Sequence, residues 1–390
     1  MISFASVNAV LFTPALPDIA TFFAVTDDVA QYIVSWFLIG YAIGQLLYGP
    51  LASRFGRKNA LYIGIVTQII ASLGCVLSGL LEVYPLLVLG RFIMALGSGV
   101  GLKMTFTLVN ECYEPKVASQ KISYLMLAFA ITPGLGVAIG GMLNAHYGWM
   151  SCFVGGAIYG ALLLWLITRL PNIESVLDTD ALKWPHLKKA YGAQLKNSAL
   201  LAGGLLMGGA TCFVYVFAAL APFIAMNMMN MNSEQYGMAN IIPSIGLIVG
   251  SLCSAQLIKR YSLGVLIKAG LGICALGSLL MVTTMALSNS AVVSLFLPMV
   301  IIYIGISFVL ANASTMAMSY VNDKAQGSAV MNFINMGLAT IVVLGLGLFS
   351  MQAMLLPVVY LGLCVMMVPV YYILMKKRSV IASKAKQSSL

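Results

Sequence analysis

Charged residues are the scarcest feature of this sequence. Only 8% of its 390 residues are Asp, Glu, Lys or Arg, whereas 61% are apolar. Soluble domains carry about 25% charged residues, so this composition excludes a soluble globular protein and predicts one that crosses a membrane repeatedly. The net charge of +10 would suggest a nucleic-acid partner in a soluble protein. Here the cations lie in short loops, and no nucleic-acid partner is expected.

Patterns typical of metal, redox and hydrolytic sites are missing as well. The seven cysteines are scattered without Cys-x-x-Cys spacing, which favours packing roles. The methionine-rich stretch 226–232 has no Cys or His nearby, which favours a flexible loop over a Cu(I) site. There is no HExxH, no GxSxG and no embedded pair of acids, which argues against a membrane enzyme. We therefore predict no metal site, no cofactor and no catalytic residues.

Twelve apolar runs are long enough to cross a bilayer, for which a helix needs roughly 20 residues. Helices are expected because they satisfy their own backbone hydrogen bonds in lipid, and the runs do not alternate as barrel strands do. The sequence thus predicts an all-α integral membrane protein. The predicted spans are 2–23, 30–52, 59–80, 85–110, 118–143, 148–170, 198–226, 237–258, 263–285, 291–319, 326–349 and 353–375.

The loop charges give these spans an orientation. Every Lys and Arg except Arg91 and Lys103 falls in or beside alternate loops or in the C-terminal segment, whereas the intervening loops hold acids such as Asp27 and Glu82. Lys and Arg are retained in the cytoplasm. This distribution predicts an even number of spans with both termini cytoplasmic, in the inner (cell) membrane of a bacterium.

The longest loop divides the spans into six and six. We predict an N-terminal six-helix bundle over 1–170, a central cytoplasmic loop over 171–196, a C-terminal six-helix bundle over 197–375 and a cytoplasmic tail over 376–390. The central loop fits either a helix on the cytoplasmic membrane surface or a solvated linker. The polar, basic end of the tail, 379–390, is expected to be disordered.

A weak internal repeat supports the division into halves. A shift of 206 residues without a gap lays residues 40–64 on residues 246–270, around the same loop of each half. Two related six-helix halves are the architecture of a secondary transporter whose substrate binds near the midplane between them. The shift superposes Gly40 on Gly246, Gly44 on Gly250, Leu46 on Leu252, Leu51 on Leu257, Arg54 on Arg260 and Gly64 on Gly270.

Residues 49–58, with the sequence GPLASRFGRK, resemble the loop signature of the major facilitator superfamily. Three further stretches are similar to the twelve-span drug/proton antiporters of that superfamily, especially the bicyclomycin-resistance type: PALP at 14–17, GRFIMALG at 90–97 and TPGLGVAIGG at 132–141. The resemblance covers essentially the whole chain. It implies the major facilitator fold, with two six-helix pseudo-repeat bundles, and multidrug efflux by antiport with protons.

Several positions depart from that family pattern. Ser53 stands where the loop signature usually has Asp, Met94 where the fourth-span motif has Gln, and Val137 where the fifth-span motif has its second Pro. Val10 stands where bicyclomycin-type members commonly carry an acid. The sequence therefore leaves the substrate open.

The resemblance assigns a gating role to the cytoplasmic turn after the second span. Similar proteins latch this turn to an acid at the foot of span four, where Glu111 stands. An Arg57–Glu111 pair that holds in one orientation and parts in the other would be a two-state element of alternating access. A topology anchor without an energetic role is the alternative. The predicted gating residues are Gly49, Arg54, Gly56, Arg57, Lys58 and Glu111.

Arg91 and Lys103 are the two charges predicted inside the spans. An embedded cation costs at least ~2.5 kcal/mol and is a functional-site hypothesis by default, although an Arg91 bonded to helix carbonyls would be structural. Lys103, about 18 Å lower on the helix, either lines the cavity or snorkels to the cytoplasmic interface. The other candidates for the substrate and coupling site are Tyr41, Gln45, Asn8 and Tyr215.

No span carries a carboxylate in its middle third. Asp18 lies toward the outer end of the first span and Glu111 toward the inner end of the fourth. With Arg91 and Lys103 as the embedded charges, the binding region is predicted to be neutral or positive. Such a region favours a neutral or anionic solute over a lipophilic cation.

Small residues of the fifth span are predicted to seal the two bundles against each other, because they let helices approach closely. Pro133 is expected to kink this span by removing a backbone hydrogen bond. The predicted inter-bundle packing residues are Pro133, Gly136, Gly140 and Gly141.

These inferences predict a monomeric secondary transporter that moves a small amphipathic solute through the bilayer by alternating access, as proton-coupled efflux of a drug or metabolite. Two alternatives remain. One is uptake or export of an anionic metabolite or chelator. The other is a transport-dead membrane sensor that keeps the fold, which substrate-driven counterflow in liposomes would distinguish from a transporter.

Overall fold

A computed structural model describes residues 1–170, 177–288, 290–319, 321 and 324–387. Some side chains within its helices lie outside the described part, chiefly in 106–130, in 184–193 and beyond 376. The described elements are all helical, which confirms the predicted all-α class.

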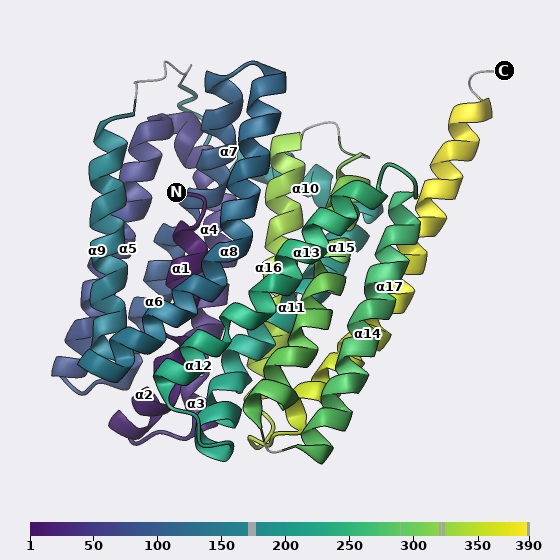
Figure 1. Cartoon of the computed structure of the whole chain (residues 1–390). Coiled ribbons are helices and arrows are strands. Elements are labelled where there is room, and N and C mark those ends of the chain that lie inside the picture. The colour runs from purple at the N-terminus through teal and green to yellow at the C-terminus, as the bar shows by residue number, and fades with distance from the viewer. Residues whose placement is uncertain (171–176, 289, 320, 322–323, 388–390) are drawn as a thin grey trace.

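The helices form two groups that stand side by side, the first half of the chain in purple and blue and the second in green and yellow (Figure 1). The first group consists of α1 (Phe4–Val10), η1 (Thr13–Ala15), α2 (Leu16–Phe22), α3 (Asp27–Ala30), α4 (Tyr32–Phe55), α5 (Arg57–Leu80), α6 (Tyr84–Ser98), α7 (Val100–Cys112), α8 (Pro115–Tyr147) and α9 (Met150–Thr168). The second consists of α11 (Ser198–Phe223), η2 (Ile224–Met228), α12 (Ser233–Ala239), α13 (Ile241–Leu257), α14 (Leu263–Leu287), η3 (Val292–Phe296), α15 (Leu297–Met318), α16 (Lys324–Leu346) and α17 (Leu355–Gln387).

Ten stretches of the described chain are long and apolar enough to cross a membrane, and each overlaps one predicted span. The first predicted span, 2–23, is instead broken into α1, η1 and α2. The fifth, 118–143, lies within α8, part of whose side chains are outside the described residues. Met1 packs against Gly101 of α7, part-way along the first bundle (Figure 1).

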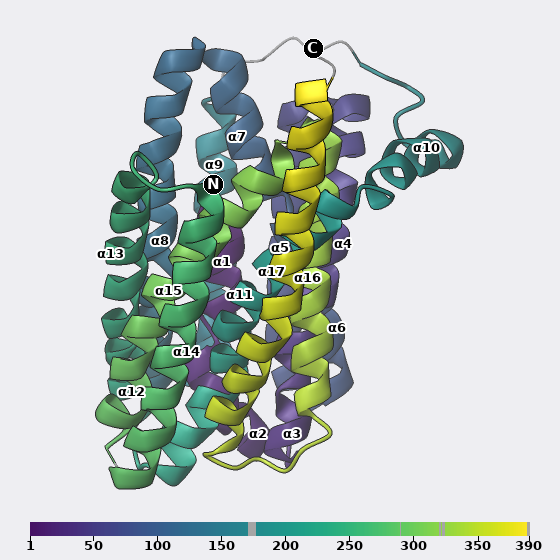
Figure 2. The same cartoon turned by 90° about the vertical axis from the view of Figure 1, so that its right-hand side faces the viewer.

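Two segments outside the spans take helical form. The central loop contains α10 (Trp184–Leu195), which lies beside the bundles (Figure 2). The tail was expected to be disordered from residue 379, but α17 continues to Gln387. The reason is that an existing helix extends at low cost through residues such as Ala and Lys, which are good helix formers.

The glycines that the internal repeat superposes make equivalent helix–helix contacts in the two halves. A Cβ added at Gly40 would lie 2.3 Å from the carbonyl oxygen of Phe92 in α6, and one added at Gly246 would lie 2.2 Å from that of Val300 in α15. Each half therefore brings its second span against its fourth through a glycine. Equivalent contacts join Gly44 to Leu96 and Gly250 to Ile304, and Gly64 to Gly97 and Gly270 to Gly305.

The two halves touch along α8 with α12 and α13, and along α4 with α16. A Cβ at Gly141 of α8 would lie 2.3 Å from the carbonyl oxygen of Ser233, and one at Gly134 would lie 2.2 Å from Ser244 Oγ. Other elements of the two halves meet where Asn227 Nδ2 of η2 donates a hydrogen bond to Asp27 Oδ2 of α3 at 3.2 Å. These contacts lie on the side predicted to be outside the cell.

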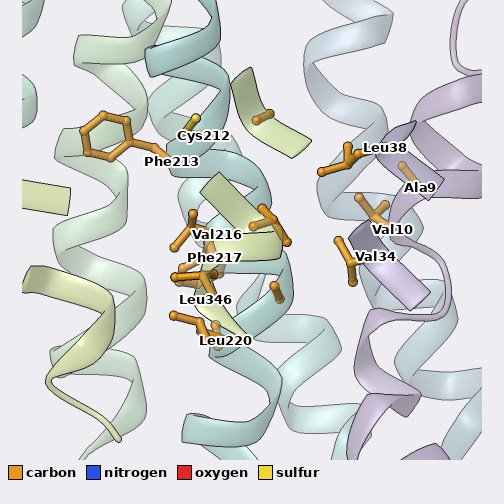
Figure 3. Packing of buried hydrophobic residues seen from close by; sticks show 14 of the residues in the cluster. Ala9, Val10, Val34, Leu38, Cys212, Phe213, Val216, Phe217, Leu220 and Leu346 are labelled. Atoms are coloured by element: carbon orange, nitrogen blue, oxygen red, sulfur yellow. The ribbon is translucent and has the colours of Figure 1, made fainter. Parts of the chain in front are cut away.

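One buried apolar cluster includes residues of both halves. Val34 and Leu38 of α4 belong to it together with Phe217 and Leu220 of α11 and Leu346 of α16 (Figure 3). The two bundles therefore share one apolar core.

Two predicted packing residues do not lie in this seam. A Cβ at Gly140 would lie 1.7 Å from the carbonyl oxygen of Leu11, and one at Gly136 would lie 3.0 Å from Val10 Cγ2, both within the first half. The prediction of an inter-bundle contact is therefore wrong for Gly136 and Gly140. Residues 136 and 140 share one face of the helix, whereas 134 and 141, seven apart, share another. Pro133 is half-buried within α8, which is continuous through it.

Candidate functional site

The break in the first span leaves a backbone carbonyl free to accept a hydrogen bond from a side chain. Pro14 has no N–H, so an unbroken helix through it would leave the Val10 carbonyl without its partner. α1 ends at Val10, and Thr13 Oγ1 donates to the Val10 carbonyl oxygen at 2.8 Å. Carbonyls in the last turn of a helix lack the next turn that would bond them. The carbonyl of Asn8 lies in this last turn.

Arg91 of α6 occupies that position. Its Nη1 donates to the Asn8 carbonyl oxygen at 2.7 Å, and its Nε lies 3.5 Å from that of Ile33 in α4. The guanidinium carbon lies 3.9 Å from the ring centroid of Phe12 and 4.2 Å from that of Phe37. The side chain is only 1% exposed. The arginine is therefore clamped between the broken first span and α4.

No described carboxylate forms an ion pair with Arg91. The aromatic faces and carbonyl oxygens supply the negative potential instead, which compensates in part for the loss of hydration. Nη2 is buried without a hydrogen-bond partner in the described part of the chain. The site thus holds a fixed positive charge with one unused donor. The hydrogen bonds to helix carbonyls that a structural arginine would make are present at Nε and Nη1. Among the described contacts of Arg91, only the Nη2 group remains available to bind another molecule.

Asn8 is itself held by a polar cluster inside the first bundle. Its Nδ2 donates to the Phe4 carbonyl oxygen at 2.9 Å, and its Oδ1 accepts from Gln68 Nε2 of α5 at 2.8 Å. Gln68 Nε2 also lies 2.9 Å from Ser72 Oγ and 3.2 Å from the Gly156 carbonyl oxygen of α9. Sequence reasoning missed Gln68, although an uncharged polar residue in the apolar third span was a signal that could have been used.

Tyrosines of both halves lie near Arg91. Tyr41 is buried in α4, stacked on Phe37 with ring centroids 6.3 Å apart, and its side chain bonds that of Gln45 one turn later. Tyr215, from α11 of the second half, is half-buried and close enough to interact electrostatically with both Arg91 and Tyr41. The structure thus brings together four predicted site residues, Arg91, Asn8, Tyr41 and Tyr215, with Gln45 beside them.

Lys103 belongs to a different place. A Cβ added at Gly49 of α4 would lie 2.5 Å from Lys103 Nζ, so the ammonium group lies against the part of α4 that is predicted to be cytoplasmic. Nearby, Tyr191 of α10 donates to the Leu46 carbonyl oxygen of α4 at 2.9 Å. Lys103 is half-buried, and the structure does not place it among the contacts of Arg91 that are described above. It groups with Gly49 of the predicted gating residues.

The turn between α4 and α5 depends on Gly56. Its φ of +88° and ψ of 158° belong to a region that is nearly restricted to glycine. Arg57, the first residue of α5, returns across the turn, and its Nη1 donates to the Ala52 carbonyl oxygen at 3.2 Å. The Glu111 side chain lies outside the described residues, so the Arg57–Glu111 pair stays a prediction.

The other two basic residues of the turn differ in their contacts. Lys58 Nζ donates to the Leu170 carbonyl oxygen at 3.0 Å, at the end of α9. A cation at a helix C-terminus bonds carbonyls that have no intrahelical partner. Arg54 is exposed, and its guanidinium carbon lies 5.4 Å from the ring centroid of Phe55. Lys58 thus ties the turn to the sixth span, while Arg54 stays at the surface.

Comparison with known proteins agrees with this architecture. The family model described as Major Facilitator Superfamily matches residues 1–343, and the chain belongs to that superfamily. It is therefore a membrane transporter and not an enzyme, as predicted. Within the family it is similar to the multidrug transporter MdfA of Shigella boydii, with 27% identity over 309 residues, 78% of this chain and 74% of that protein.

A second relative and a solved structure show the same relationship. A chloramphenicol resistance protein of Pseudomonas aeruginosa is 24% identical over 310 residues, 78% of this chain and 71% of that protein. The inward-open xylose transporter XylE from E. coli superposes with a TM-score of 0.71 over 96% of this chain and 94% of that one, at 16% identity. The latter likeness shows the fold alone. The predicted resemblance to drug antiporters of this superfamily is confirmed.

Proposed function

We propose that this transporter exports a small amphipathic solute, neutral or anionic, from a bacterial inner membrane in exchange for protons. The observation that carries the proposal is Arg91, a buried cation that aromatic rings and carbonyls hold in place with no described carboxylate beside it. A lipophilic cation would be repelled by this charge, whereas a neutral or anionic group would find a donor in Nη2. Relatives named for chloramphenicol and multidrug resistance support export of amphipathic compounds.

We infer alternating access in which this state is closed on the outer side, because the close contacts at Gly134 and Gly141 would hold the outer ends of the two halves together. The solute would be taken up from the cytoplasmic side in this state, and parting of the seam would release it outside. The turn at Gly56, held by Arg57 and Lys58, would gate the cytoplasmic end, with cytoplasmic termini and a monomeric unit. Binding of solute between Tyr41 and Tyr215 would place it in contact with both halves.

A flux assay in proteoliposomes tests this proposal. The purified protein would be reconstituted with an imposed pH gradient and offered chloramphenicol as the neutral probe and ethidium as the cationic one. We expect gradient-dependent accumulation of chloramphenicol that falls at least tenfold in Arg91→Ala, and little ethidium transport. Strong ethidium transport by the wild-type chain would overturn the proposed substrate class.

The unpartnered Nη2 of Arg91 also favours a second candidate function, movement of an anionic metabolite or chelator. A carboxylate would accept from this donor and add charge-assisted strength to the bond. Benzoate as the anionic probe in the same liposomes separates the two substrate classes. If no probe is taken up, counterflow with preloaded solute decides between a transporter and a transport-dead sensor.

A further inference from the structure

We propose that Gln68 is a positioning residue for Arg91. It holds the end of α1 so that the Asn8 carbonyl meets the guanidinium, and it acts through Asn8 without touching the solute. This proposal deepens the transport function proposed above and rests on it. Gln68 itself is completely buried in α5.

The first step concerns the helix end that carries Asn8. Because α1 stops at Val10 and η1 begins at Thr13, the backbone hydrogen bonds of one continuous helix do not fix this end. The side chain of Asn8 supplies the missing constraint. Its Nδ2 is used by the Phe4 carbonyl within α1, so its Oδ1 faces outward as an acceptor.

The second step is the donor that meets this acceptor. Gln68 Nε2 bonds Asn8 Oδ1 at 2.8 Å and the Gly156 carbonyl of α9 at 3.2 Å. Gln68 therefore fastens the end of α1 to two helices at once. From Asn8 the connection continues through its carbonyl to Arg91 Nη1 at 2.7 Å. The chain of bonds runs from α9 and α5 through α1 to α6.

The third step is the space made for this side chain. A Cβ at Gly160 of α9 would lie 2.4 Å from Gln68 Oε1, and one at Gly156 would lie 3.3 Å from Asn8 Oδ1. Two glycines one turn apart thus leave a hollow that the amides of Gln68 and Asn8 fill. Any larger residue at Gly160 would displace Gln68.

The second half of the chain shows that the fold does not require this glutamine. The shift of 206 residues places Gln68 on Cys274 and Ser72 on Ser278. The equivalence holds in space, because a Cβ at Gly97 would lie 2.7 Å from the backbone nitrogen of Gln68, and one at Gly305 would lie 2.8 Å from that of Cys274.

At this equivalent crossing a thiol stands in place of the amide, beside a hydroxyl as in the first half. Cys274 is buried and its Sγ lies 3.6 Å from the Ile302 carbonyl oxygen, while Ser278 Oγ donates to the Cys274 carbonyl within its own helix at 2.7 Å. Ser278 Oγ also lies 4.0 Å from Cys364 Sγ of α17, and Tyr360 of α17 donates to the Phe213 carbonyl oxygen of α11 at 2.7 Å. The same helix crossing is thus built without a glutamine–asparagine link where there is no arginine to place. The connection from Gln68 through Asn8 therefore accompanies Arg91 and is not needed for this helix crossing.

A double-mutant cycle tests the coupling to Arg91. Gln68→Leu keeps most of the side-chain volume and removes every hydrogen bond; we expect chloramphenicol flux to fall about tenfold, the scale of one lost buried hydrogen bond. Combined with Arg91→Lys, it should add little to the loss caused by Arg91→Lys alone. Ser278→Ala is the matched control at the equivalent crossing and should leave flux unchanged. Fully additive effects of Gln68→Leu and Arg91→Lys would overturn the proposal.

A second readout does not depend on transport. Cys75 Sγ would lie 2.7 Å from a Cβ at Gly90, next to Arg91, and is completely buried. In a chain that keeps only this cysteine, labelling by a small membrane-permeant maleimide should be about tenfold faster with Gln68→Leu and unchanged with Ser278→Ala. Asn8→Ala removes the same link and should behave like Gln68→Leu if that variant does not assemble.

The two readouts separate the two hypotheses. Faster Cys75 labelling without chloramphenicol flux in the wild type would support the positioning role and overturn the proposed function. Labelling at the wild-type rate in both Gln68→Leu and Asn8→Ala would overturn the positioning role, whatever the flux.

Discussion

The guanidinium carbon of Arg91 lies 3.9 Å from the ring centroid of Phe12, in the break of the first span. The break therefore does two things, since it frees the Asn8 carbonyl and turns an aromatic face toward the same charge. The proline at position 14, which requires this break, is thus a structural requirement of the arginine site.

Replacing Phe12 should weaken transport without undoing the fold. Phe12→Leu keeps an apolar side chain but removes the cation–π contact, which is worth about 0.5–2 kcal/mol. We expect transport efficiency in proteoliposomes to fall by a factor of about 2–30. Phe213→Leu, in the second half, removes an equally buried ring that packs on Tyr360 and has no arginine beside it. Equal transport losses in both variants would show that Phe12 acts by packing alone.

Adding one methyl group at Gly141 should hold the outer seam apart. A Cβ there would lie 2.3 Å from a backbone oxygen of the other half, a contact that only a shift of the helices can relieve. Gly141→Ala should therefore abolish most transport and raise the labelling of cysteines placed at the outer end of the seam. Gly362→Ala is the control, because a Cβ at that position meets nothing within 4 Å. Normal transport by Gly141→Ala would contradict the seam as a moving contact.

Gly56→Ala should lower stability through the backbone of the turn. At a φ of +88° and ψ of 158° a Cβ costs about 1–3 kcal/mol. We expect a clear fall in the apparent melting temperature in detergent, measured by tryptophan fluorescence. Gly74→Ala in α5, where a Cβ meets nothing within 4 Å, should leave the melting temperature unchanged or slightly raised. An unaltered melting temperature for Gly56→Ala would mean that the turn takes another conformation.

Gln31 should destabilise the conformation in which the outer seam is closed. Its side chain is completely buried beside Gly347, with neither amide atom hydrogen-bonded in the described structure. A buried polar group without a partner costs about 1–3 kcal/mol, which water would relieve once the seam opens. Gln31→Leu should therefore slow the labelling of outer-side cysteines about tenfold. Thr283→Val, at an exposed site of α14, is the control. Faster labelling of Gln31→Leu would refute this account.

Much of the architecture could be predicted because the position of each membrane span depends on the hydrophobicity of a short local stretch of sequence. Ten predicted spans recur as helices, since a run of apolar residues in lipid has few alternatives to a helix. The weak match of Gly40 with Gly246 correctly indicated two equivalent helix crossings. The site was harder to predict, because Arg91 and Lys103 share one span by sequence yet lie against different partners.

The amino-acid sequence alone determined the class of protein, the helices and the presence of an unbalanced positive charge within them, because each depends on composition and on neighbouring residues. Tertiary structure decided what holds that charge. The bonds from Arg91 to Asn8 and from Gln68 to Asn8 join residues 83 and 60 positions apart. Tertiary structure also decided that Gly136 packs within the first half and Gly141 against the second. The sequence does not distinguish these two glycines, because the difference between them lies in the helix that packs against each.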